Sequence, residues 1–348
     1  MSLVLTRMQN FRAASNLDKW EVRASQYGGL NVFAKQTDGI MSIITEELKA
    51  RASAAMGSTL ETPVLDWEDP TIGSTRPVTI SDAESTSAMQ SITFATYQFG
   101  FTMVPSQYTN NEVAYQRDFN HKLELRLNKL LATLDTAALT ALNAAKTQVV
   151  GNLLGKYTFG VTDTVNALNS QRLRIMADVN PLMGSNDFYQ PTHIVGEAGL
   201  MSTFLEIQES GLYNSQNRAI QWADKELHFT NRLTNAATKV ATGYVVNEGS
   251  CGIVSRVDRD AQARHTTTSG YSWNEVAVPG LPFTMGLMYY ENAADKNALS
   301  AGTADLTATK VEAYSWSVDV AMVTAYNSAI ATRAAPIMKF DIDVDETL

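Results

Sequence analysis

The chain has 348 residues, of which 45% are apolar, and a formal net charge of −9 at pH 7. Its length suits about two domains, and its apolar fraction is enough for a buried core, which excludes an intrinsically disordered chain. The negative charge excludes a protein that grips nucleic acid over a broad basic face, because neutralising phosphates requires clustered Lys and Arg.

The N-terminus and the cysteine content bear on location. Residues 1–7 lack the charged and apolar pattern of a secretory leader, and no apolar run approaches the roughly 20 residues that cross a bilayer. The single cysteine, Cys251, cannot form an internal disulfide. We therefore expect a soluble intracellular protein without membrane contact, in which Cys251 is an inert thiol in a reducing cytoplasm.

The N-terminal segment, residues 1–36, shows no sustained periodicity and is interrupted by Gly28 and Gly29. This composition predicts an arm that becomes ordered by packing on the rest of the molecule. Asp38 is a suitable N-cap for a helix that ends near Gly57. The apolar side of that helix consists of Ile40, Ile43, Ile44, Leu48 and Ala52.

Residues 63–67 and 77–80 are extended by pattern and flank a polar loop, which predicts a long two-stranded ribbon. Such a ribbon is marginal in water because it cannot bury its own apolar side chains. We therefore expect Leu65, Trp67 and Ile72 to pack against another subunit.

A strand pattern over residues 92–104 changes phase near Ala95 and Thr96, as a β-bulge would cause. Pro105 ends this strand. A long amphipathic helix then runs from Thr109 to Lys146, and Thr109 and Glu112 have capping-box spacing at its start. Its apolar stripe consists of Phe119, Leu123, Leu127, Leu130, Leu131, Leu134, Ala138 and Leu142.

Short elements separated by Gly, Pro, Asn and Ser predict a compact domain with a central sheet over about residues 158–308. We expect helices at 162–179, ended by Pro181, and at 197–209. The expected strands are 192–195, 240–246, 252–257 and 283–290.

Two strands with a period of two, at 314–322 and 338–344, close the chain. We expect both to return and lie beside the long helix. Asp341, Asp343 and Asp345 would share one face of the second strand, where they could hold a hard cation or form a solvated edge that discourages association. We favour the solvated edge.

No signature of a catalytic or cofactor site is present. Between Gly151 and Lys156 the glycines are one residue too close for a phosphate loop, and Tyr157 replaces the Ser or Thr that would bind magnesium. The four histidines, His121, His193, His228 and His265, are scattered, which argues against zinc. Nucleophile-elbow and dinucleotide fingerprints are missing. We therefore predict no catalytic residue, no cofactor and no metal.

The order of arm, ribbon, long helix, compact domain and returning strands resembles that of tailed-phage major capsid proteins with the HK97-like fold, an α+β fold. This resemblance covers nearly the whole chain and includes no short diagnostic motif. It implies the following division: N-terminal arm 1–36, P-domain helix 37–57, E-loop ribbon 58–104, P-domain spine helix 105–157, A-domain 158–308, and P-domain returning strands with the C-terminus 309–348.

The resemblance also implies a function and partners. The chain would self-assemble through hexamers and pentamers into an icosahedral shell around a double-stranded DNA genome, in a virion assembled in the bacterial cytoplasm. Portal, scaffolding or decoration proteins would be its partners, and its contact with DNA would be weak and non-specific. Two alternatives stay open: the shell protein of an encapsulin-like nanocompartment, and a soluble enzyme with an unrecognised site.

Overall fold

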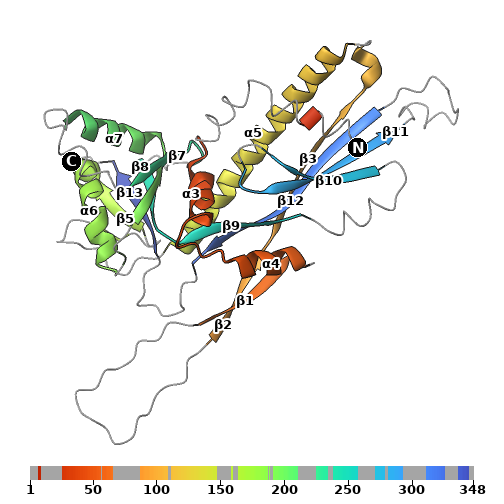
Figure 1. The fold of residues 1–348 in the computed structure, drawn as a ribbon. Coiled ribbons are helices and arrows are strands. Elements are labelled where there is room, and N and C mark those ends of the chain that lie inside the picture. The colour runs from red at the N-terminus through yellow and green to blue at the C-terminus, as the bar shows by residue number, and fades with distance from the viewer. Residues whose placement is uncertain are drawn as a thin grey trace, which may run out of the picture.

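The computed structural model describes residues 7–8, 26–55, 57–65, 87–108, 111–146, 158–159, 164–186, 188, 191–210, 225–233, 238–257, 271–278, 281–292, 311–325 and 336–344. Helices and mostly antiparallel strands are mixed, which confirms the α+β class (Figure 1). The helices are α3 (Gly28–Thr37), α4 (Glu46–Ala54), α5 (Glu112–Ala145), α6 (Arg172–Gly184) and α7 (Ala198–Ser210), with the 3-10 turns η1 (Pro105–Tyr108) and η3 (Asn169–Gln171).

The strands fall into three sheets. A two-stranded ribbon contains β1 (Thr59–Leu65) and β2 (Ser87–Thr93). The first large sheet contains β10 (Tyr271–Ala277), β11 (Thr284–Asn292), β12 (Val311–Thr324), β3 (Ala95–Met103) and β9 (Cys251–Arg256). The second contains β4 (Thr158–Phe159), β5 (Thr164–Leu168), β13 (Ile337–Asp343), β8 (Lys239–Asn247), β6 (Pro191–Gly196) and β7 (Glu226–Phe229), in that order.

The long helix α5 lies along the first large sheet, as the sequence predicted (Figure 1). Its 34 residues extend about 50 Å at 1.5 Å per residue. The predicted stripe is buried and packs on aromatic side chains of β3 and β12: the rings of Phe101 and Phe119 are 5.3 Å apart, and Trp316 is fully buried beside them. The helix begins later than expected. Its N-cap is Asn111, whose side chain accepts a hydrogen bond from the Ala114 N–H, while Thr109 lies outside the described residues.

The predicted change of phase in residues 92–104 corresponds to a change of sheet. β2 pairs with β1, β3 pairs with β12, and the single residue Phe94 separates them. Phe94 is buried, its N–H donates to the Ser58 carbonyl over 2.8 Å, and the Arg256 guanidinium lies 4.3 Å from its ring centre. The ribbon is therefore attached to the body at a well-packed hinge residue.

The second large sheet departs from the prediction in its local elements. Residues 164–168 form strand β5, with Val165 and Ala167 buried, where a helix was expected from residue 162. The helix α6 starts only at Arg172 and continues past Pro181 to Gly184. Pro181 has no N–H and so removes one hydrogen bond from the helix, which ends three residues later at Gly184.

The last strand, β13, does not return to the sheet beside α5. It pairs in parallel with β5 and antiparallel with β8, inside the second large sheet. Asp341 is buried and accepts a hydrogen bond from the Thr242 hydroxyl, and Asp343 forms an ion pair with Lys239. The expected solvated edge is therefore wrong for these two residues. Asp345 lies outside the described residues.

Strand pairing also crosses the predicted boundary at residue 308. The strands β9, β10 and β11 come from the segment expected to form the compact domain, yet they belong to the first large sheet. β9 and β11 pair with β12, and β10 pairs with β11. The chain thus passes between the two large sheets more than once. Long-range pairing of this kind leaves no mark in local periodicity.

The segment before the ribbon contains two helices, and their positions differ from those predicted from the sequence. Gly28 and Gly29 begin α3, where a break in an arm was expected, and the next helix, α4, begins after Thr45. The Thr45 hydroxyl accepts the Leu48 N–H over 3.2 Å, so the expected cap at Asp38 is wrong. α3 contacts β9 of the first large sheet and β6 and β7 of the second, and it therefore connects the two.

Candidate functional site

The ribbon of β1 and β2 projects away from both large sheets (Figure 1). Its seven paired positions run from Thr59 opposite Thr93 to Leu65 opposite Ser87. Since side chains alternate along strands, one face of the ribbon carries Leu60, Val64 and Ile92, and the other carries Pro63, Leu65 and Met89.

The base of the ribbon is anchored on its own chain. Ile92 and Phe94 belong to a small core cluster with Leu48 and Ala52 of α4, and Leu60 packs against it. The Arg51 guanidinium donates to the Glu61 carbonyl over 3.0 Å, and the Gln90 amide donates to the Thr324 carbonyl over 3.3 Å. These contacts fix the direction in which the ribbon leaves the body.

The opposite face of the ribbon carries apolar side chains that are exposed to solvent, and we call it the bare face. Leu65 is 77% exposed and Met89 is 60% exposed, and the exposed Pro63 lies directly opposite Met89 in the register. Of the three residues predicted to pack between subunits, only Leu65 is described, and it lies on this face. Trp67 and Ile72 lie outside the described residues. Packing of all three against another molecule stays a prediction.

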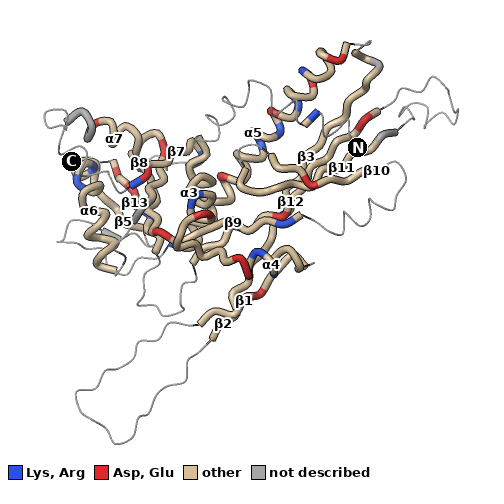
Figure 2. Tube along the Cα trace, viewed as in Figure 1, with Lys and Arg blue, Asp and Glu red and all other residues tan. Residues whose placement is uncertain are grey.

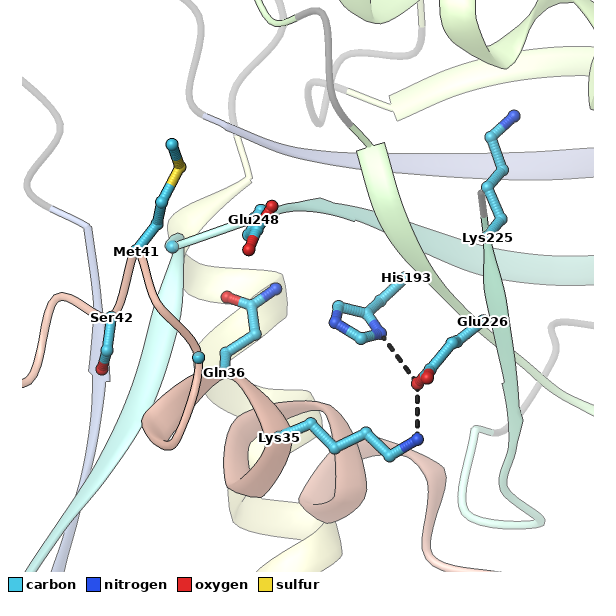
Figure 3. A pocket seen from close by; sticks show the side chains of 10 residues that line it. Lys35, Gln36, Met41, Ser42, His193, Lys225, Glu226 and Glu248 are labelled. Atoms are coloured by element: carbon cyan, nitrogen blue, oxygen red, sulfur yellow. Dashed lines mark hydrogen bonds and ion pairs between the residues drawn. The ribbon is translucent and has the colours of Figure 1, made fainter. Parts of the chain in front are cut away.

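A second feature is a pocket of about 320 Å³ between α3 and the second large sheet (Figure 3). α3 contributes Lys35 and Gln36, β6 contributes His193, β7 contributes Glu226, and the turn between β8 and β9 contributes Glu248. The Lys35 ammonium donates to Glu226 Oε2 over 2.5 Å, and both side chains are about half exposed.

The four histidines are scattered along the sequence, but the fold brings His193 and His228 together. β6 and β7 pair in parallel, with His193 opposite Glu226 and Val195 opposite His228. Glu226 and His228 are two residues apart on one strand and therefore share a face with His193. The spacing of Glu226 and His228 was the available signal. That spacing indicates a shared face only within a strand, and the sequence pattern did not predict a strand at residues 226–229.

Burial governs the protonation of both rings. His228 is 7% exposed and His193 is 9% exposed. Burial, helped by the neighbouring His193, lowers the pKa of His228 to about 4, and burial also lowers the pKa of His193. Both imidazoles are therefore neutral at pH 7.

The lone thiol, Cys251, lies next to Gln36, one of the residues that line this pocket. Cys251 is fully buried and its Sγ lies 3.4 Å from Gln36 Oε1. Burial raises the pKa of the thiol, so little of it is thiolate at neutral pH. This environment agrees with the expected inert role.

Charges of both signs are interspersed over the described residues (Figure 2). Along α5, for example, Lys122 alternates with Asp118 and Glu124, and Lys122 pairs with Asp118 over 2.8 Å. No broad basic face is formed by the part of the chain that the structure describes. Among the described helices, none is both long and apolar enough to span a membrane.

Comparison with known proteins gives no sequence relative. No protein-family model matches the chain, and no curated protein matches it. Solved structures with a similar chain include Mycobacterium phage Che8, with 10% identity, a TM-score of 0.46 and coverage of 85% of this chain and 88% of that one. The capsid structure of the cyanophage P-SCSP1u has 9% identity and a TM-score of 0.46 and covers 84% of each chain. The capsid of Ralstonia phage GP4 has 10% identity and a TM-score of 0.44, with coverage of 84% and 85%. Similarity at this level does not by itself establish a function.

Proposed function

We propose that this chain is a structural subunit that self-assembles into the icosahedral capsid of a double-stranded DNA phage, with an HK97-like arrangement of its parts. The observation that carries the proposal is the bare apolar face of a ribbon that extends from a well-packed body. In this arrangement the ribbon is the E-loop, α5 and the first large sheet form the P-domain, and the second large sheet with α6 and α7 forms the A-domain.

On physical grounds, we expect a partner molecule to cover the exposed face of the ribbon. A two-stranded ribbon is marginal in water, and three neighbouring apolar side chains on its exposed face add an unfavourable contact with solvent. The base of the ribbon is fixed by Phe94 and its neighbours, so the ribbon does not need to fold back to be ordered. A second copy of the chain is the proposed cover, with Trp67 and Ile72 extending the surface that begins at Leu65.

A shell also requires contacts at more than one place on each subunit, because one self-complementary patch gives only a dimer. Further exposed apolar side chains lie on α6 and α7, at a side of the molecule away from the ribbon (Figure 1). Met201 and Leu205, one helical turn apart on α7, are 44% and 49% exposed, and Leu173 of α6 is 44% exposed. We assign this group to contacts between A-domains within a hexamer or pentamer.

The proposed role is structural and not catalytic. Portal, scaffolding or decoration proteins would be further partners, with the virion as the final location after assembly in the bacterial cytoplasm. The interspersed charges support a weak, non-specific contact with packaged DNA, since strong binding would need clustered cations. An encapsulin-like compartment would use the same contacts and would differ in enclosing protein cargo.

The direct test introduces a charge on the bare face of the ribbon. Leu65→Asp should abolish particles in electron microscopy of the purified chain, because an unpaired carboxylate would be buried in the contact. The circular dichroism of the unassembled subunit should stay unchanged, since Leu65 is exposed there.

The matched control is Leu65→Met, which changes the same exposed side chain but keeps it apolar and of similar volume. It should assemble far better than Leu65→Asp. Normal particles from Leu65→Asp, or a wild-type chain that stays monomeric at high concentration under all conditions, would contradict the proposal. Nucleic acid inside the particles, as opposed to protein cargo, would separate a capsid from a nanocompartment.

A further inference from the structure

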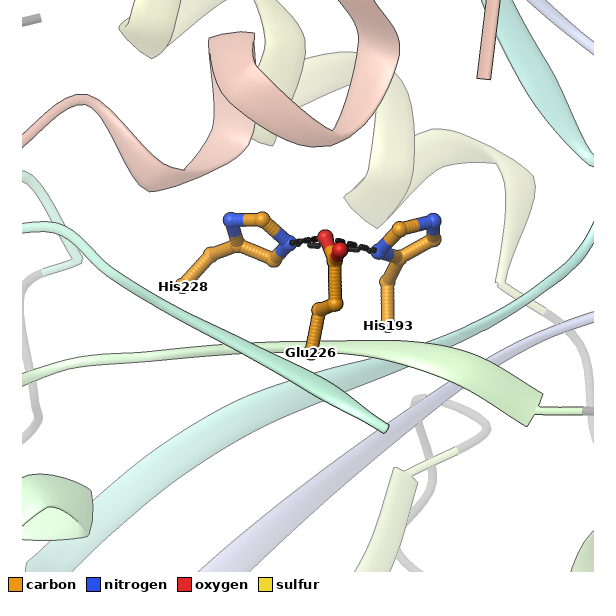
Figure 4. Close-up of side chains that lie close together, drawn as sticks. All are labelled: His193, Glu226 and His228. Atoms are coloured by element: carbon orange, nitrogen blue, oxygen red, sulfur yellow. Dashed lines mark hydrogen bonds and ion pairs between the residues drawn. The ribbon is translucent and has the colours of Figure 1, made fainter. Parts of the chain in front are cut away.

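His193, Glu226 and His228 place two imidazole nitrogens and a carboxylate oxygen at the corners of a small triangle (Figure 4). His193 Nδ1 and His228 Nε2 are 3.2 Å apart, and Glu226 Oε2 lies 3.6 Å from the former and 3.4 Å from the latter. In the figure, the facing nitrogens of both rings point toward the carboxylate between them.

These separations match those between the ligands of one transition-metal ion. Ligand atoms at about 2.0–2.1 Å from a tetrahedral zinc ion are about 3.3 Å from one another. A point equidistant from the three atoms lies about 2.0 Å from each, given their separations. We infer that His193, Glu226 and His228 bind a divalent transition-metal cation of the zinc class, with the pocket beside α3 providing room for a water as fourth ligand.

The chemistry of the groups agrees with this geometry. Both imidazoles are neutral, and a neutral ring offers one lone pair to a metal. In the metal-free protein one of the two facing nitrogens carries the proton of their mutual hydrogen bond. On binding, that ring changes tautomer: its proton moves to the far ring nitrogen, and both facing nitrogens become ligands. Calcium and magnesium would not be held, because both require mostly oxygen ligands and Glu226 alone supplies them here.

Lys35 is the competitor for this site. It donates to the same oxygen, Glu226 Oε2, that the ion would bind. Its side chain is 53% exposed, so it can move to solvent or to the other carboxylate oxygen at small cost. The metal would therefore replace an exposed ion pair by a bond that joins β7, the short edge strand, to β6. We expect the ion to stabilise this edge of the sheet.

The experiment uses the untagged full-length chain, stripped of metal and titrated with Zn²⁺ by calorimetry. We expect one ion per chain, no binding of Mg²⁺ or Ca²⁺, and a higher Tm with Zn²⁺. Glu226→Gln keeps the shape of a half-exposed side chain, so it should fold, and it should weaken Zn²⁺ binding about 100-fold or more, as should His193→Ala. Replacing Zn²⁺ by Co²⁺ should give the visible absorption of a four-coordinate site in the wild type and not in Glu226→Gln.

Two controls separate a metal site from a structural cluster. His121→Ala removes an exposed histidine of α5 and should leave binding unchanged. Lys35→Ala should bind Zn²⁺ at least as tightly as the wild type, because it removes the competitor. Binding below one ion per chain, equal loss in His121→Ala, unchanged binding in Glu226→Gln, or loss in Lys35→Ala would each overturn the inference. None of these outcomes depends on whether the chain forms shells.

Discussion

At the scale of single residues, Glu312, at the start of β12, joins three parts of the chain through its carboxylate. Its Oε2 accepts hydrogen bonds from Arg7, Tyr115 and Tyr314 over 2.6, 2.5 and 2.8 Å, and it is only 4% exposed. These contacts join the N-terminal segment, α5 and the first large sheet. A buried carboxylate is tolerated only when its oxygens are satisfied in this way.

This network makes stability depend on pH. Burial alone would raise the pKa of Glu312, but the hydrogen bonds from Tyr115, Arg7 and Tyr314 outweigh it and lower the pKa below 4.5. A lowered pKa stabilises the folded state above pH 4.5, and this contribution is lost as pH falls through the folded-state pKa. Glu312→Gln should lower the free energy of unfolding by about 2 kcal/mol at pH 7.

The measurement is urea unfolding of both chains between about pH 7 and pH 3. The difference between wild type and Glu312→Gln should shrink as the solution becomes more acidic. Glu61→Gln, an exposed residue of the ribbon, should change stability by less than about 0.5 kcal/mol at pH 7. A constant difference across the whole pH range would show that the charge of Glu312 is not its source.

At the scale of elements, α3 depends on a side chain from another helix. Its own N-cap, Tyr27, makes no capping hydrogen bond with its side chain. Asp135, fully buried in α5, accepts the Leu30 N–H over 3.0 Å and the Thr230 hydroxyl over 2.6 Å. A Cβ on Gly28 would lie 2.8 Å from the Phe229 carbonyl oxygen, so only glycine allows this close approach to β7. One carboxylate therefore fixes both α3 and the end of β7.

Removing that carboxylate should loosen the junction. Asp135→Ala leaves two buried donors without a partner and should lower the free energy of unfolding by about 3 kcal/mol. Hydrogen exchange should increase most at the start of α3, while the middle of β12 stays protected. Thr136→Ala, at the next and exposed position of α5, is the control and should cost under about 0.5 kcal/mol. Uniform loss of protection would contradict a local role.

Helices and strands were predicted correctly where the hydrophobic pattern was local and repeated. The stripe of α5 recurs over many turns, and the alternation of β12 continues over most of its length, so single exceptions did not obscure them. The prediction for β5 and α6 was wrong because the pattern of a buried five-residue strand just before a helix resembles the start of that helix. The His193, Glu226 and His228 cluster could not be predicted, because it depends on parallel pairing of strands more than 30 residues apart.

At the scale of the whole molecule, two large sheets are joined through α3 and α5, and the ribbon extends beyond them (Figure 1). The body has continuous buried clusters of its own, one beside α5 and one beneath α6 and α7. Apolar residues in those clusters stabilise the single chain. Under the proposed function, apolar residues on the exposed face of the ribbon stabilise only the assembly. Substitutions in the body should therefore lower the stability of the subunit, and substitutions on that face should lower the yield or stability of particles.

A pair of tryptophans tests this division. Trp316 is fully buried against Phe101 and Phe119, and Trp316→Ala should lower the free energy of unfolding of the isolated subunit by about 3–5 kcal/mol. Trp67→Ala should leave that free energy within about 1 kcal/mol, yet it should reduce particle formation or particle stability far more, because its proposed partner surface belongs to another chain. Unfolding of dissociated subunits, followed by circular dichroism, and particle yield by electron microscopy measure the two effects separately. Equal losses of subunit stability and particle yield in Trp67→Ala would place that side chain in the subunit's own core and remove the basis for an interface formed by the ribbon.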